Sequence, residues 1–126
     1  MTDIYSVAQY IFLKSNTLIA TMQVQRLTFI SNLYYFHLYA KPLYPELSYK
    51  GKTSPISHEL QKLHRNKYLM PDLEIEPNLT ETEKQAIDRV LNIWGLQWGE
   101  HLAEWCRNRG LTGNGELIDL NECAIL

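Results

Sequence analysis

A long segment that is apolar on most of its sides, residues 21–40, constrains the fold of this chain more than any other feature. Its apolar side chains recur at helical spacing and extend well beyond a single helix face: Val24, Leu27, Ile30, Tyr34 and Leu38, widened by Phe29, Leu33 and Phe36. A helix that is apolar on most sides is normally buried in the middle of a domain. We therefore expect residues 21–40 to form a central, aromatic-rich helix around which the remaining chain folds.

Capping signals and apolar periodicity predict shorter elements on both sides of this helix. Helices are expected over residues 3–14 and 54–66, from Thr80 to Gly95, and through Trp98 to Gly110. Ser54-Pro55 has the form of an N-cap followed by proline at the first helical position. A short strand is expected within 47–52, with a segment of 68–78 as its candidate partner.

The predicted fold class is mainly α with minor β. A chain of 126 residues is long enough for one domain with one core. We expect a compact bundle of about five helices around the central helix, with a small antiparallel hairpin or sheet. The helical domain is predicted over residues 1–110, and residues 111–126 are predicted to form a C-terminal tail.

The charge of the chain is unevenly distributed, although the formal net charge is only −2. From Lys41 to Lys67 there are six Lys/Arg against two Glu, a net charge of +4. From Tyr68 to Glu104 there are two Lys/Arg against eight Asp/Glu, a net charge of −6. This polarity either orients a charged partner or reflects two solvated faces of opposite sign. The overall charge disfavours nucleic acid as a partner.

The sequence favours a cytoplasmic protein without a membrane segment. Two cysteines are too few for the disulfide framework of a small secreted domain. The N-terminus does not resemble a secretory signal, and no apolar run approaches the roughly 20 residues that span a bilayer. The C-terminal residues 123–126 match a prenylation box, but the preceding stretch is acidic, so we interpret the match as chance and expect this apolar end to contact a partner or the body.

No motif points to catalysis, a metal or a cofactor. The sequence lacks the nucleophile elbow, the phosphate-binding loop and the dinucleotide fingerprint. Its four histidines do not pair with one another or with cysteine at the spacing of zinc ligands. His58 has no evident nucleophile to activate. We therefore predict a protein that is not an enzyme and that binds no metal and no cofactor.

The aromatic and basic residues around the end of the central helix suggest a binding surface instead. The polar strip of this helix continues through the hydroxyl groups of Tyr35 and Tyr39, which are the aromatic side chains most able to reach the surface. Exposed aromatic residues beside basic ones suit a protein interface. They also suit single-stranded nucleic acid. The predicted partner-binding residues are Tyr35, Tyr39, Lys50, Lys52, Ser54, Pro55 and His58.

Several segments resemble the Panacea domain in order and spacing. The similar residues are Val24-Gln25-Arg26-Leu27, Lys41-Pro42-Leu43-Tyr44, Ser54-Pro55-Ile56 and Trp94-Gly95-Leu96. The family carries lysine where this chain has Arg26, and glycine at the positions of Ala40 and Ser54. The resemblance covers roughly residues 4–106 and implies a mainly helical fold with a small antiparallel sheet.

The resemblance also implies a function. Panacea domains act as antitoxins that neutralise toxins by direct contact, and some deliver the bound toxin to a ClpXP-type protease. We accordingly expect a bacterial or phage protein whose partner is another protein, and homo-oligomers are compatible with this reading. The alternatives are a phage-encoded inhibitor of a host defence system, of the anti-CRISPR kind, and a small nucleic-acid-binding regulator.

Overall fold

The computed structural model describes residues 1–95 and 99–123, and it is mainly helical with one small antiparallel sheet. The predicted fold class is therefore confirmed. The elements are α1 (Ile4–Lys14), α2 (Thr21–Tyr39), β1 (Tyr49–Lys50), β2 (Pro55–Ile56), α3 (His58–His64), α4 (Glu81–Trp94), α5 (Gly99–Asn108) and the short 3₁₀ helix η1 (Leu120–Glu122). Of the last predicted helix, Trp98 lies outside the described residues.

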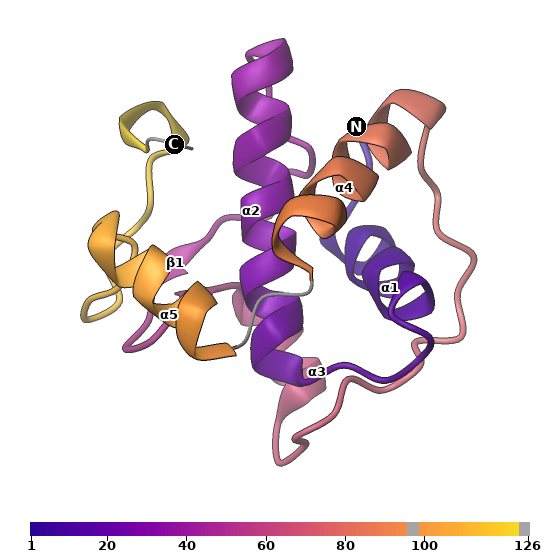
Figure 1. Cartoon of the computed structure of the whole chain (residues 1–126), viewed down its shortest axis with the longest axis horizontal. Helices are drawn as coiled ribbons and strands as arrows, with labels where there is room; N and C mark the ends of the chain where they lie inside the picture. Colours follow the sequence, from indigo (N-terminus) through magenta and orange to yellow (C-terminus); the bar gives the residue numbers. More distant parts are fainter. Residues whose placement is uncertain (96–98, 124–126) are drawn as a thin grey trace.

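Helix α2 is the hub that the sequence predicts. It runs through the middle of the molecule, with α1 and α4 on one side and α5 with the C-terminal segment on the other (Figure 1). Eleven of its nineteen residues are buried. One exception to the predicted apolar face is Leu38, which is half exposed because the last turn of α2 extends beyond the elements that pack against the rest of the helix.

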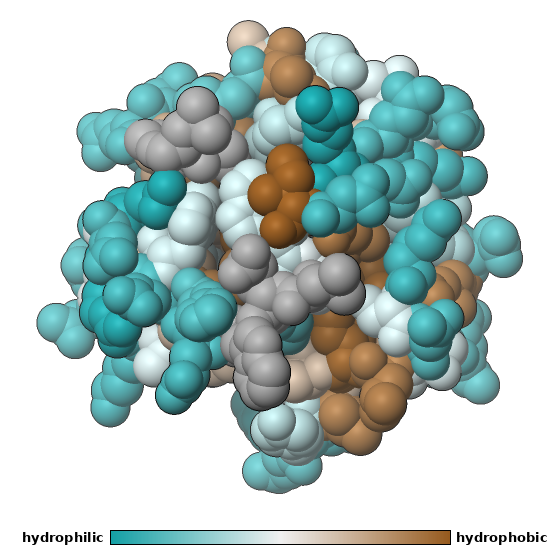
Figure 2. All heavy atoms as spheres, in the orientation of Figure 1, coloured by the Kyte–Doolittle hydropathy of each residue, from teal (hydrophilic) through white to brown (hydrophobic). Residues whose placement is uncertain are grey.

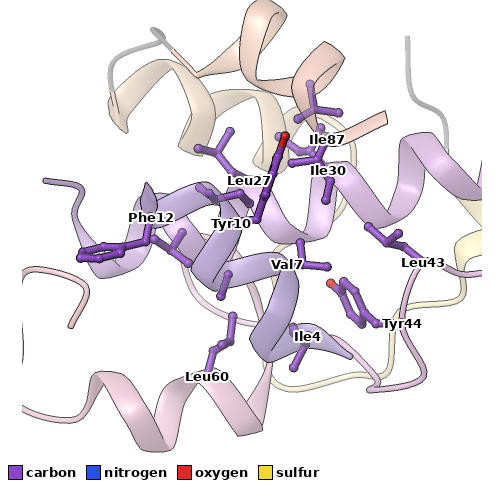
Figure 3. Packing of buried hydrophobic residues seen from close by; sticks show 14 of the residues in the cluster. Ile4, Val7, Tyr10, Phe12, Leu27, Ile30, Leu43, Tyr44, Leu60 and Ile87 are labelled. Atoms are coloured by element: carbon purple, nitrogen blue, oxygen red, sulfur yellow. The ribbon is translucent and has the colours of Figure 1, made fainter. Parts of the chain in front are cut away.

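The core consists of two clusters on opposite sides of α2. The larger one joins α1, α2, α3 and α4, and it includes Val7, Leu27, Ile30, Leu60 and Ile87, each at most 1% exposed (Figure 3). The smaller cluster places Phe29 and Leu33 of α2 against Cys106, Leu111 and Ile118. Since each side of α2 has its own cluster, the wide apolar surface of this helix is accounted for by packing within the chain.

Several predicted helix boundaries are confirmed by their capping contacts. Asp3 caps α1 by accepting a hydrogen bond from the Ser6 N–H at 2.8 Å. Thr80 and Glu83 form the predicted capping box at the start of α4, in which each side chain accepts from the other residue's N–H. Helix α2 ends at Ala40, whose φ of 57° is the left-handed conformation usual at a helix C-terminus.

The predicted start of α3 at Ser54-Pro55 is wrong. Pro55 belongs to β2 and lies opposite Lys50, and Ser57 caps the helix by accepting a hydrogen bond from the Leu60 N–H at 3.2 Å. Proline at a strand position lacks only the N–H, which a two-residue strand at the border of a sheet can spare. The correct cap is another serine three residues later, which the extended geometry of Pro55-Ile56 places at the helix start.

The predicted strand partner within 68–78 is also wrong, because β1 pairs with β2 in the register Tyr49↔Ile56 and Lys50↔Pro55. Leu69 instead forms an isolated antiparallel bridge with Ala20, and the residues that follow form an irregular segment that polar groups of α1 hold in place. Gln9 contacts this segment twice, accepting from the Leu73 N–H at 3.0 Å and donating to the Asp72 carboxylate at 2.7 Å.

The C-terminal segment is part of the core. Leu111 and Ile118 are 2% and 7% exposed, and Leu117 lies opposite Tyr49 in an isolated antiparallel bridge. The predicted boundary after residue 110 therefore does not separate two packing units among the described residues. None of the described helices combines the length and apolar character needed to cross a membrane.

Candidate protein-binding surface

Three of the predicted binding residues, Lys50, Lys52 and His58, meet at one open groove. The groove has a volume of about 360 Å³ and lies between the β1–β2 hairpin, the start of α3 and the turn at residues 113–115. The hairpin is tight at Gly51, where a Cβ atom would come within 2.6 Å of the Ser54 carbonyl oxygen. A glycine is therefore required at this point to bring Lys50 and Lys52 beside α3.

An aromatic stack forms one side of this groove. The rings of Tyr49 and His58 lie 4.4 Å apart between centroids and are tilted by only 5°. The exposed His58 ring is thus held flat against a residue of the sheet rather than moving freely at the helix start. The stack presents a flat, partly polar face between the two lysines and α3.

The hollow continues along α3, where sequence reasoning missed two further cations. A second depression is lined by His58, Gln61, Lys62 and Arg65. These residues are spaced by three or four positions, the spacing of neighbours on one face of a helix. This spacing is visible in the sequence, and it is the signal by which Lys62 and Arg65 could have been predicted. We call the surface formed by Lys50, Lys52, His58, Gln61, Lys62 and Arg65 the basic groove.

Ser54 and Pro55 are buried beneath the basic groove and are not part of its surface. The Ser54 hydroxyl group donates to Met22 Sδ of α2 at 3.4 Å. Next to it, the Gln25 side chain of α2 accepts from the Ser57 N–H at 3.0 Å and donates to the Ser57 carbonyl oxygen at 3.3 Å. These buried contacts position the groove by fixing the hairpin and the start of α3 against the hub helix.

Tyr35 and Tyr39 do not flank this surface, contrary to the prediction. Tyr35 is 6% exposed, and its ring packs at 4.7 Å from that of Tyr39, which is 44% exposed. Tyr35 lies ten residues beyond Gln25 on α2, or roughly 15 Å along the helix axis at 1.5 Å per residue. The sequence places these tyrosines near Lys41, but the chain leaves the end of α2 and returns toward its beginning before it forms the hairpin.

The cysteines do not provide a reactive thiolate. Cys106 is buried, and burial raises the pKa of its thiol to about 11, although Arg26 and Arg109 act in the opposite direction. Burial also raises the pKa of Cys123 above its usual value. A thiol with a raised pKa stays protonated at neutral pH and is a poor nucleophile. Among the described residues, no three His, Cys, Asp or Glu side chains form a group that could hold a metal ion.

A further hollow, of about 690 Å³, lies elsewhere, between the α1–α2 connection and the end of α4. Figure 2 shows a hydrophobic band over this connection, where Leu18 is 69% exposed. The residues that line the hollow include both Lys14 and Asp88, so the hollow has no dominant charge. One of its lining residues, Gly95, is the last described residue before the gap at 96–98, and for these two reasons the hollow supports no assignment.

Acidic pH should destabilise the protein through His64, the last residue of α3. His64 is 8% exposed, with Nε2 at 3.1 Å from Met70 Sδ, and burial together with the nearby Lys67 charge lowers its pKa to about 4. Between pH 6.5 and 4 the unfolded chain binds a proton at this residue that the folded chain does not, so stability falls as the pH drops through this window. Because the ring borders an open depression, we expect a loss of about 1–2 kcal/mol at pH 4.5 relative to pH 7.5, below the unscreened value.

Urea unfolding at pH 7.5 and pH 4.5 measures this effect, and variants isolate it from carboxylate titration. His64→Leu should reduce the difference in unfolding free energy between the two pH values by about 1–2 kcal/mol. His101→Leu, at an exposed position of α5, should leave the difference unchanged. Equal pH dependence in wild type and His64→Leu would show that His64 is not buried in its neutral form.

Comparison of the chain with protein-family models, with curated protein sequences and with solved structures found no match.

Proposed function

We propose that this chain is a protein-binding domain of the antitoxin type, which neutralises a partner by covering an acidic surface with the basic groove. The observation that carries the proposal is the concentration of cationic side chains, Lys50, Lys52, Lys62 and Arg65, around an ordered aromatic stack on an open surface. The surrounding segment from Lys41 to Lys67 has a net charge of +4.

The two kinds of residue in the basic groove would contribute differently to binding. Charges at the rim of an interface guide association and select the partner more than they add affinity. In many interfaces a few residues near the centre, often aromatic ones, contribute most of the binding energy. In this groove the Tyr49–His58 stack is the anchor, and the lysines and Arg65 are the guiding charges. Little conformational entropy is lost on binding, because the stack is already formed.

The resemblance of residues 4–106 to the Panacea domain supports the class of partner that we propose. It suggests a toxin that the chain neutralises in the cytoplasm, with delivery to a ClpXP-type protease as an additional role. In a phage the same surface would serve to block a host defence protein. Both roles rest on tight binding to one protein, and the position of the gene distinguishes them.

The test is co-expression of this chain with each protein encoded by its neighbouring genes, followed by purification through a tag on the partner. We expect one stable complex, and we expect the double variant Lys52→Glu/Arg65→Glu to weaken it at least tenfold. Arg89→Glu, an exposed charge reversal on α4, is the matched control and should leave the affinity unchanged. A complex that tolerates Lys52→Glu/Arg65→Glu, or no complex with any neighbour, would contradict the proposal.

Single-stranded nucleic acid is the second candidate, and the Tyr49–His58 stack beside Lys50 and Lys52 is the observation that favours it. Bases stack on aromatic side chains while cations contact the phosphates. Such binding weakens steeply with salt because counterions are released. A fluorescence titration with a 12-nucleotide single strand at 50 and 200 mM salt distinguishes the candidates, since no binding at either salt concentration excludes nucleic acid.

A further inference from the structure

The two-stranded sheet is extended by an isolated antiparallel bridge between Tyr49 and Leu117, on the side of β1 that faces away from β2. Residues 116–118 run antiparallel to β1, because the Lys50 N–H donates to the Glu116 carbonyl oxygen at 2.8 Å and the Ile118 N–H donates to the Ser48 carbonyl oxygen at 3.0 Å. Tyr49 and Leu117 lie opposite each other between these two bonds. β2 pairs with the other side of β1, so residues 116–118 form an edge of the sheet.

The backbone of Leu117 is available at this edge. In an antiparallel pair, the residue between two such hydrogen bonds directs its own N–H and C=O away from the neighbouring strand. In the part of the chain that the structure describes, neither group of Leu117 has a hydrogen-bond partner, and the residue is 56% exposed. An edge of this kind is a template for an additional strand from another polypeptide.

An apolar groove lies directly beside this edge. Its volume is about 340 Å³, and Leu117 is one of its lining residues. Phe36, Pro42, Pro45 and Leu47 are among its other apolar lining residues, and Leu47 is 55% exposed. A strand added along Leu117 would alternate its side chains between two faces, so that every second side chain points toward this groove.

The charges at the rim indicate what the added strand carries. Glu46 and Asp119 are the charged residues among those that line the groove, and both are acidic. We propose that the edge at residues 116–118, with its groove, binds an extended segment of another protein in which a large aliphatic side chain is flanked by Lys or Arg. The aliphatic side chain enters the groove, backbone hydrogen bonds form with Leu117, and the flanking cations meet the acidic rim.

This site is separate from the basic groove and does not depend on the function proposed for it. The two grooves share no lining residue, and they have opposite charge. Ser48, immediately before β1, lines the apolar groove, and Lys50 of β1 lines the basic groove. A domain with both sites would hold an acidic partner and a basic extended segment at the same time.

A peptide with fluorescein on its N-terminal amine, fluorescein-Lys-Val-Leu-Val-Lys-amide, is the probe for this site. Fluorescence anisotropy should report binding to the full chain, and the amide resonances of Leu117 and the residues around the groove should shift in NMR spectra. A peptide of the same sequence with N-methylated backbone amides should bind at least tenfold more weakly, because it cannot pair with an edge strand. Replacing both lysines of the peptide by glutamate should weaken binding to a similar extent.

Variants of the chain locate the binding. Leu47→Arg places a cation in the groove wall and should weaken binding of the lysine peptide at least tenfold. Leu38→Arg, at a leucine of similar exposure outside the groove, is the matched control and should bind as wild type. Equal binding of the N-methylated peptide, equal binding to Leu47→Arg, or no binding at 1 mM peptide would overturn the proposal. A homodimer that Leu47→Arg dissociates and Leu38→Arg does not would assign the edge to a second copy of this chain and would also overturn it.

Discussion

Replacing Gln25 by leucine should lower the free energy of unfolding by about 2 kcal/mol, although leucine has a similar size. Gln25 is 4% exposed on the hub helix, and its amide group is the partner of both the N–H and the carbonyl oxygen of Ser57. Leucine leaves the buried Ser57 N–H without a partner, which costs roughly 1–3 kcal/mol, whereas the Ser57 carbonyl oxygen keeps its hydrogen bond from the Gln61 N–H at 2.9 Å. The expected drop in melting temperature is about 5–10 °C for a domain of this size.

Urea unfolding monitored by circular dichroism measures this effect, and a second glutamine supplies the control. Gln85→Leu, at an exposed position of α4, should change the stability by less than about 0.5 kcal/mol. If the unfolding free energies of Gln25→Leu and Gln85→Leu were equal, the Gln25 side chain would not hold Ser57 in the folded protein. The variant also bears on function, because the same contacts position the hairpin and α3 beneath the basic groove.

The elements that the sequence predicts correctly are those whose signals are local. The hub helix is evident because apolar residues cover most of its circumference, and no partner segment has to be known to recognise this. Asp3 and the Thr80–Glu83 capping box are recognised for a similar reason, since the groups that bond lie three residues apart. In each case the information sits within one or two helical turns.

The errors concern contacts between segments far apart in the chain. Ser54 precedes a proline and matches the cap pattern, but β1 pairs with Pro55-Ile56 and draws those residues into a strand. The cap then moves to Ser57, which Gln25 holds from a position 32 residues earlier. A strand of two residues has no periodicity that a sequence pattern can detect. The sequence therefore predicts a partner for β1 within residues 68–78, whereas the partner is β2.

In the candidate site, too, the residues predicted correctly are close in sequence, and the errors concern contacts between distant segments. Lys50, Lys52 and His58 lie within nine residues, and the structure brings them to one groove. The polar strip of the hub helix predicts that Tyr35 and Tyr39 reach the surface, yet the pattern of one helix does not show that Tyr35 is covered when the chain folds. The groove walls at residues 113–115 come from a segment more than fifty residues away, and no local signal links them to the hairpin.

Removing everything after Gly110 should leave a chain that does not fold stably. Leu111 and Ile118 are buried against Phe29 and Leu33 of the hub helix, and each buried aliphatic side chain contributes about 1.5–3 kcal/mol. The loss of both amounts to about 3–6 kcal/mol, which is comparable with the whole stability of many domains. The truncation also exposes the Phe29 side of the hub helix and removes the segment at residues 116–118 that pairs with β1. We expect the truncated chain to lose cooperative thermal unfolding and to aggregate.

Two neighbouring substitutions test the same packing in the intact chain. Ile118→Ala should cost about 2–4 kcal/mol, because it leaves a cavity beside Phe29 and Leu33. Leu117→Ala removes a similar side chain that is 56% exposed and should cost less than about 1 kcal/mol. The two residues are adjacent in an extended segment, so their side chains point to opposite faces, and only one face meets the hub helix.

Similar unfolding free energies for the two variants, or a cooperative transition in the chain that ends at Gly110, would mean that the hub helix is covered on one side only. In that case the helical domain would end where the sequence alone places its boundary.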